Sequence, residues 1–116
     1  MQIVEVWGVP DNVSRVTLAK LSDQIIEVVT FEMGCRPESV RVFYPKDMLT
    51  QGGYENVFVY LKTAMFEGGE GDNAIAITAT IELAKIVCAA LETHDVECFT
   101  ESLPKDSHYD VRVKRS

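Results

Sequence analysis

Four stretches of this 116-residue chain alternate as β-strands do, and the sheet they predict is apolar on both faces. One face carries mostly valines: Val4, Val6, Val40, Val42, Val57, Val59, Leu61, Val96 and Cys98. The other face is rich in aromatic residues: Ile3, Trp7, Phe43, Phe58, Tyr60 and Phe99. The sequence predicts only two helices, and two helices can cover only one face of such a sheet. The second apolar face then needs another cover, and association of several copies is the simplest one. The alternative is a monomer with scattered surface aromatics.

The expected strands are residues 2–7, 40–44, 56–63 and 95–100, with a short fifth strand or an arm at 108–113. A helix lies between the strands of each half, so the order is β-α-β followed by β-α-β. We therefore expect one domain, 1–116, with repeat halves at about 1–50 and 55–105 and a C-terminal arm at 106–116. Right-handed crossovers make the two strands within each half parallel.

The first helix is predicted from a cap at Asn12 or Ser14 to about Met33, where Gly34 ends it. The second helix is predicted from a cap at Asp72 or Asn73 to about Thr93. Its expected buried stripe has helical spacing and consists of Ile77, Ile81, Ala84, Cys88 and Leu91.

Composition excludes several classes of function. The net charge is −7 and the isoelectric point about 4.7, which argues against nucleic acid and anionic membrane surfaces as partners. Charges interrupt the apolar stretches before the roughly 20 residues of a membrane span, and we read no signal peptide at the N-terminus. We therefore expect a cytoplasmic protein. The three cysteines lack metal-ligand spacing and are expected to be reduced, and no motif calls for a metal or another cofactor.

The segment that begins at Gly34 reads GCRPESVRVFYPKDMLTQGGYENVFVYL. It resembles the central stretch of the macrophage migration inhibitory factor and phenylpyruvate tautomerase family. In that stretch a helix ends in glycine, a basic residue precedes proline, and a VxV strand leads into a loop, a Gly-Gly pair and another strand. The layout of most of the chain also resembles a tautomerase-like family of uncharacterised bacterial proteins.

Two folds have the order β-α-β-β-α-β: the ferredoxin-like sandwich and the tautomerase fold. The aromatic second face and the near-equal halves favour the tautomerase fold, an α/β (α+β) architecture with a four-stranded mixed sheet and two helices on one face. The resemblance implies a homotrimer in which three sheets line a central barrel. It also implies active sites between subunits, at the start of the first strand.

The N-terminus departs from the pattern that the resemblance implies. In the tautomerase superfamily the catalytic base is an N-terminal proline, exposed after removal of the initiator methionine. An apolar pocket lowers the pKa of that amine, which brings it closer to ambient pH. Here residue 2 is Gln, and Met1 is expected to stay because Gln2 is bulky. Met1 and Gln2 thus mark the catalytic position, but the usual base is missing.

Other candidate site residues follow from residue type and from the resemblance. Arg36 matches the basic residue that binds the substrate carboxylate in the family, and an arginine grips a carboxylate with two hydrogen bonds. The alternative is a surface arginine that complements a helix dipole. Tyr60 and Tyr109 are candidate donors to a substrate oxygen, with packing as the alternative role. Arg41 and Lys62 lie on the aromatic face, where partners such as Glu5, Glu97 or a bound anion are expected.

Two functional hypotheses remain open. The first is a tautomerase-like isomerase that performs keto–enol tautomerisation of a small carboxylate bound by Arg36. The second is an inactive trimeric module that kept the fold, lost the proline base, and binds a small ligand or serves a structural role.

Overall fold

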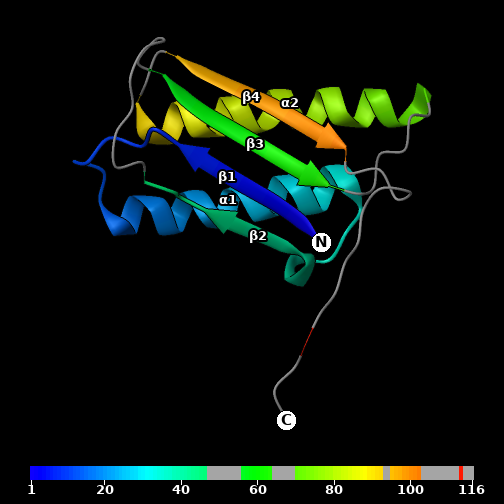
Figure 1. The fold of residues 1–116 in the computed structure, drawn as a ribbon, viewed down its shortest axis with the longest axis horizontal. Coiled ribbons are helices and arrows are strands. Elements are labelled where there is room, and N and C mark those ends of the chain that lie inside the picture. The colour runs from blue at the N-terminus through cyan, green and yellow to red at the C-terminus, as the bar shows by residue number, and fades with distance from the viewer. Residues whose placement is uncertain (47–55, 64–69, 93–94, 103–112, 114–116) are drawn as a thin grey trace.

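The computed structural model describes residues 1–46, 56–63, 70–92, 95–102 and 113. Within these ranges the chain forms one four-stranded sheet with two antiparallel helices on the same face (Figure 1). The elements in chain order are β1 (Gln2–Trp7), α1 (Arg15–Met33), a 3₁₀ turn η1 (Pro37–Ser39), β2 (Val40–Phe43), β3 (Val57–Thr63), α2 (Glu70–Leu91) and β4 (Val96–Ser102).

The strand order across the sheet is β2-β1-β3-β4. β1 and β2 are parallel, β3 and β4 are parallel, and β1 and β3 meet antiparallel at the centre of the sheet. The two predicted β-α-β units are therefore confirmed, and so is the mixed sheet with both helices on one face. The expected fifth strand at 108–113 lies outside the described residues except for Val113.

Helix α1 begins and ends where the sequence predicts. The Ser14 hydroxyl caps the N-terminus by accepting a hydrogen bond from the Thr17 backbone N–H at 3.1 Å. At the other end Gly34 adopts a left-handed conformation with φ of 64°, and its N–H donates to the Thr30 carbonyl at 3.0 Å. Because the helix ends at Met33, a short link remains in which the chain reverses direction before β2 begins.

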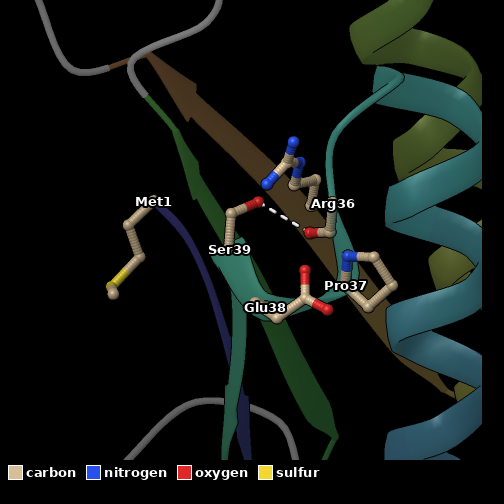
Figure 2. A pocket seen from close by; sticks show the side chains of 5 residues that line it. All are labelled: Met1, Arg36, Pro37, Glu38 and Ser39. Atoms are coloured by element: carbon tan, nitrogen blue, oxygen red, sulfur yellow. Dashed lines mark hydrogen bonds between the residues drawn. The ribbon is translucent and has the colours of Figure 1, made fainter.

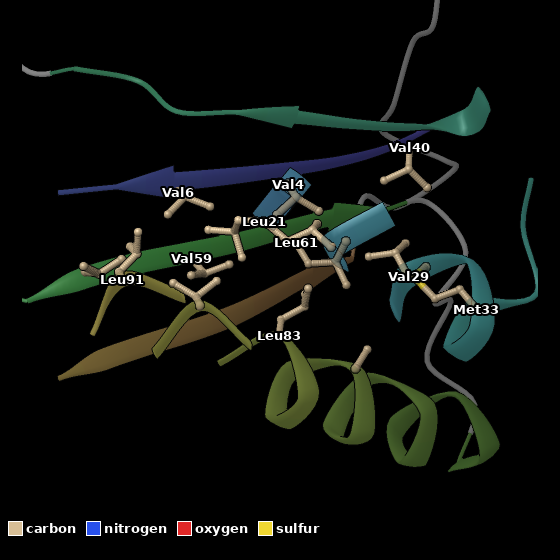
Figure 3. Packing of buried hydrophobic residues seen from close by; sticks show 14 residues of the cluster. Val4, Val6, Leu21, Val29, Met33, Val40, Val59, Leu61, Leu83 and Leu91 are labelled. Atoms are coloured by element: carbon tan, nitrogen blue, oxygen red, sulfur yellow. The ribbon is translucent and has the colours of Figure 1, made fainter. Parts of the chain in front are cut away.

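The hydrophobic core lies between the sheet and the helices (Figure 3). The strands contribute the valine-rich face predicted from the sequence, and α1 contributes one helical stripe. The buried residues are Val4, Val6, Val40, Val57, Val59 and Leu61 from the strands and Leu21, Ile25, Val29 and Met33 from α1. The helix-covered face of the sheet is thus confirmed, and its remaining predicted members, Val42, Val96 and Cys98, are half-buried and pack against this core.

The predicted buried stripe of the second helix is wrong for two isoleucines. The side chains of Ile77 and Ile81 are 60% and 47% exposed. Leu91 is buried as predicted, and α2 buries Ala79, Leu83 and Val87 in addition. The helix also begins at Glu70, before the predicted cap at Asp72 or Asn73. The cause is that α2 is apolar nearly all round, so helical spacing alone could not identify the face that packs on the sheet.

The same composition bears on the expectation about membrane-length segments. Ala74–Leu91 of α2 is long and apolar enough to cross a membrane by length and composition, because Glu82 and Lys85 are its only charged residues. In this fold 22% of that stretch is buried, and the buried residues form the face that packs against the sheet. Much of the apolar surface of α2 therefore faces outward.

Candidate functional site

A pocket with a volume of about 700 Å³ lies at the end of the sheet where β1 and β2 begin. It is lined by Met1, Arg36, Pro37, Glu38 and Ser39. In the view of Figure 2, Met1 lies on one side, Arg36 on the other, and Ser39 between them. Two residues predicted from the sequence, Met1 and Arg36, thus line the same pocket although they are 35 positions apart in the chain.

The link between α1 and β2 positions Arg36. Gly34 ends the helix, and Pro37 begins η1 with its fixed φ angle, so Arg36 occupies the N-cap of the turn in an extended conformation. The Ser39 N–H donates to the Arg36 carbonyl at 3.0 Å, and the Ser39 hydroxyl approaches the same carbonyl oxygen at 2.8 Å. The backbone of Arg36 is therefore held, while its guanidinium is exposed.

Gln2 does not line this pocket. It lies in phase with Val4 and Val6 on β1, so its side chain points toward the helix-covered face and is only 4% exposed. The Ser39 hydroxyl donates to Gln2 Oε1 at 2.9 Å, and Gln2 Nε2 donates to Thr63 Oγ1 at 3.5 Å. The candidate position Met1/Gln2 is therefore divided: Met1 borders the pocket, and Gln2 anchors the start of β1 beneath it.

The pocket combines one cation and one carboxylate. Arg36 forms no ion pair with any residue that the structure describes, so its guanidinium is available to an anionic ligand. Sequence reasoning missed Glu38 and Ser39 as pocket residues. The sequence R-P-E-S indicated that they could lie near Arg36, because a turn that begins with proline keeps the neighbouring side chains close together. Such an arrangement can bind a small carboxylate and place a carboxylate or an amine near it.

Tyr60 lies away from the pocket, on the face of the sheet that the helices leave uncovered. This open face comprises Ile3, Glu5, Trp7, Arg41, Phe43, Phe58, Tyr60, Lys62, Glu97, Phe99 and Glu101. Tyr60 stacks on Phe99 with ring centroids 5.4 Å apart, and Phe58 lies 6.4 Å from the same ring. Ring packing and the Lys62 ammonium, 5.9 Å from the centre of the Tyr60 ring, are thus the contacts that the structure records for Tyr60. Tyr109 lies outside the described residues.

Two charged groups on the open face are paired within the subunit, as predicted for Lys62. Lys62 Nζ lies 3.1 Å from Glu5 Oε2, and the Trp7 indole N–H donates to Glu5 Oε1 at 2.9 Å. The Trp7 hydrogen bond, with the help of Lys62, lowers the pKa of Glu5 against the opposing effect of burial. Arg41 has a different contact: its guanidinium carbon lies 5.7 Å from the centre of the Phe43 ring.

Solved structures share this fold over nearly the whole chain. A fused 4-OT wild-type symmetric trimer is 19% identical over 89% of this chain and 86% of its own, with a TM-score of 0.69. A macrophage migration inhibitory factor-like protein from Entamoeba histolytica is 8% identical over 94% and 95%, with a TM-score of 0.70. A member of the cis-3-chloroacrylic acid dehalogenase family is 12% identical over 93% and 79%, with a TM-score of 0.72.

These structures belong to the tautomerase superfamily, so the fold resemblance predicted from the sequence is confirmed. At the level of sequence, no protein-family model matches the chain, and no curated protein matches it either. The identities are low, and the likeness therefore concerns the fold.

Proposed function

We propose that this protein is a cytoplasmic, trimeric tautomerase-like protein whose Met1–Arg36 pocket binds a small carboxylate and supports keto–enol proton transfer on it. The observation that carries the proposal is that Met1 and Arg36 line one pocket at the start of β1 in a tautomerase fold. The exposed guanidinium matches a planar carboxylate in shape and charge. The trimer is supported by the symmetric trimer among the similar structures and by the apolar open face.

Proton transfer needs a base within reach of the bound carboxylate. Gln2 offers none, because an amide does not titrate and its side chain is buried in hydrogen bonds. The groups at the pocket that can accept a proton are the Glu38 carboxylate and an amine at Met1. We assign the transfer to one of these two groups, with Arg36 holding the substrate.

The burial of Gln2, which removes this residue as a base, also favours a second function: binding without catalysis. If neither remaining group acts as a base, the protein is a small-carboxylate-binding module without catalysis. The two functions share the pocket and the role of Arg36, and they differ in whether bound substrate is converted.

The test is an ultraviolet assay with enolised phenylpyruvate and with a hydroxymuconate-type dienol, combined with calorimetric titration of phenylpyruvate. The variants are Arg36→Ala, Glu38→Gln and Gln2→Pro, with Arg15→Ala as a matched control at the opposite, exposed end of α1. We expect Arg36→Ala to weaken binding by about 10- to 100-fold, the usual cost of a lost charge-assisted hydrogen bond, and Arg15→Ala to leave it unchanged.

The outcomes separate the two functions. Turnover by the wild type that falls in Arg36→Ala supports catalysis, and a further fall in Glu38→Gln assigns the base. Binding that depends on Arg36, without turnover until Gln2→Pro is introduced, supports the binding module. Neither binding nor turnover by the wild type contradicts both.

A further inference from the structure

Gln2 and Thr63 are the two polar side chains that are buried in the described part of the chain, and they are partners across the sheet. Each lies in phase with apolar residues of its own strand. Gln2 precedes Val4 and Val6 in β1, and Thr63 follows Leu61 in β3. An apolar side chain at either position would extend the core without the cost of removing a polar group from water. The polarity of this pair therefore needs an explanation other than packing.

The polar pair lies at the end of the sheet that carries the pocket. Gln2 begins β1 and is the partner of Val40, the first residue of β2. The pocket residue Ser39 immediately precedes Val40. Its hydroxyl donates to Gln2 Oε1 at 2.9 Å, and Gln2 Nε2 donates to Thr63 Oγ1 at 3.5 Å. The buried amide of Gln2 is thus bonded on one side to the pocket and on the other to β3.

Ser39 connects the turn that carries Arg36 to β1. The backbone hydrogen bonds from Ser39 N–H to the Arg36 carbonyl and from Val40 N–H to the Pro37 carbonyl lie within the turn and its cap. The Ser39 hydroxyl also lies 2.8 Å from the Arg36 carbonyl oxygen (Figure 2). One hydroxyl proton therefore faces two acceptors, this carbonyl and the amide oxygen of Gln2. The Ser39 side chain links the start of β1 to the backbone of Arg36.

This link bears on how the pocket binds a ligand. Met1 lies on one side of the pocket and is the chain neighbour of Gln2, whereas Arg36 lies on the other side. The Arg36 guanidinium has no ion pair among the residues that the structure describes, so the backbone of the turn decides where it starts from. A ligand binds more tightly when both sides of its pocket are held in place beforehand, because ordering them at the moment of binding costs free energy.

We propose that Gln2 and Ser39 are positioning residues of the pocket. Their hydrogen bond holds the Arg36 turn at a fixed place relative to Met1 and thereby pre-organises the pocket for a small carboxylate. The inference rests on the proposed binding of a small carboxylate and extends it to Gln2, a residue that does not line the pocket. It accounts for the polarity of position 2, because an apolar side chain there would form no hydrogen bond with Ser39.

Calorimetric titration with phenylpyruvate tests the hydrogen bond from both ends. Gln2→Met and Ser39→Ala each remove it, and each is expected to weaken binding by about 3- to 10-fold, the usual contribution of one hydrogen bond. The double variant is expected to lose no more than either single variant, because the same bond is removed only once. Ser39→Thr returns the hydroxyl and is expected to recover most of the loss.

Ser22→Ala is the matched control for Ser39→Ala. The Ser22 hydroxyl lies 2.8 Å from the Tyr44 hydroxyl, which follows the far end of β2. The change therefore removes a serine bridge of the same kind at the opposite end of the strand. It is expected to leave the affinity for phenylpyruvate unchanged.

Stability distinguishes positioning from a merely structural role. Gln2→Met combined with Thr63→Val replaces both buried polar side chains by apolar ones of similar shape, an exchange that is close to neutral or stabilising for folding. We expect urea unfolding with an unchanged or higher midpoint, together with the weaker binding of Gln2→Met. Thr63→Val alone keeps the bond between Gln2 and Ser39 and is expected to bind as the wild type does.

NMR relaxation of the backbone amides reports on the turn without a ligand. In Gln2→Met, we expect the order parameters of the Arg36 and Ser39 amides to fall from about 0.85, the value of a rigid backbone, toward about 0.6. The amide of Ser22 lies within α1 and serves as the internal reference.

The outcomes separate this inference from the proposed function. A wild type that does not bind phenylpyruvate contradicts the proposed function; lower order parameters in Gln2→Met then still support a held turn, and unchanged ones overturn it. If the wild type binds and Gln2→Met and Ser39→Ala bind equally well, the proposed function stands and the inference is overturned. Parallel losses of affinity and of unfolding free energy in the Gln2→Met, Thr63→Val variant would assign the pair a structural role and also overturn it.

Discussion

Val59 and Tyr60 are neighbours on β3, yet they belong to surfaces with different physical requirements. Val59 is fully buried among aliphatic side chains from both helices, as Figure 3 shows for its neighbourhood. Tyr60 is half-buried, stacks on Phe99, and lies near the Lys62 ammonium. The helix-covered face is complete within one subunit, whereas the open face mixes aromatic rings with charges that are only partly satisfied there. Such a surface suits contact with a partner rather than the interior of a single domain.

The largest expected effect of this difference concerns stability. Leu61→Ala removes a fully buried side chain from the helix-covered face and should lower the free energy of unfolding by about 2–5 kcal/mol. Phe99→Ala on the open face should cost an isolated subunit only about 1 kcal/mol, the value of an aromatic pair. Urea unfolding at matched, low subunit concentration measures both. Equal losses would contradict the assignment of the core to one face.

A second expected difference concerns cysteine chemistry. Burial raises the pKa of the Cys98 thiol, on the helix-covered face, to about 12. A cysteine introduced by Glu97→Cys would lie next to it in the chain but on the exposed face. At pH 8 we expect iodoacetamide to modify Cys98 roughly 10²- to 10³-fold more slowly, because little thiolate is present. Peptide mass spectrometry gives both rates, and urea should abolish the difference. Comparable rates in the folded protein would show that Cys98 is accessible as thiolate.

The smallest expected effect concerns pH. The pKa of Glu5 is lower in the folded protein than its ordinary value of 4.5, so the unfolded chain takes up the proton first as the pH falls. The stabilisation by Glu5 is therefore complete above the unfolded value and is lost as the pH falls through the folded value. Between neutral and acidic pH, Glu5→Gln should therefore lose less unfolding free energy than the wild type, by about 1 kcal/mol or less.

Unfolding followed by fluorescence of Trp7, the single tryptophan, measures this effect between neutral and acidic pH. Glu27→Gln, on the exposed side of α1, is the matched control and should leave the acid dependence unchanged. An unchanged slope in Glu5→Gln would show that the Trp7 and Lys62 contacts do not stabilise the ionised carboxylate.

Most of the fold could be predicted because polar and apolar residues occupy clearly different positions along the strands and along α1. The alternation along β1 and β3 specified the buried face, and Ser14 and Gly34 specified the ends of α1. α2 lacks this contrast. Ile77 and Ala79 are both apolar, but only Ala79 is buried. Which of the two packs on the sheet depends on the shape of the sheet, and hydrophobic periodicity gives no information about that shape.

The candidate site could be predicted in part for a related reason. Met1 and Arg36 were expected together, and they line one pocket. The alternation along β1 also predicts that Gln2 is buried with Val4 and Val6. The sequence analysis instead assigned Gln2 to the catalytic position, because the resemblance implies a proline there. Glu38 enters the pocket through the geometry of a 3₁₀ turn, which a local sequence pattern specifies only weakly.

The anchoring of Gln2 has a practical consequence for work with the purified protein. Its side-chain hydrogen bonds hold the first residue of β1 in place, so a sequence added at the N-terminus leaves the fold at Met1. A purification tag fused ahead of Met1 would therefore emerge at the pocket that Met1 and Arg36 line, and it would obstruct small ligands there. Binding and turnover are best measured with a tag that is cleaved without leaving extra residues.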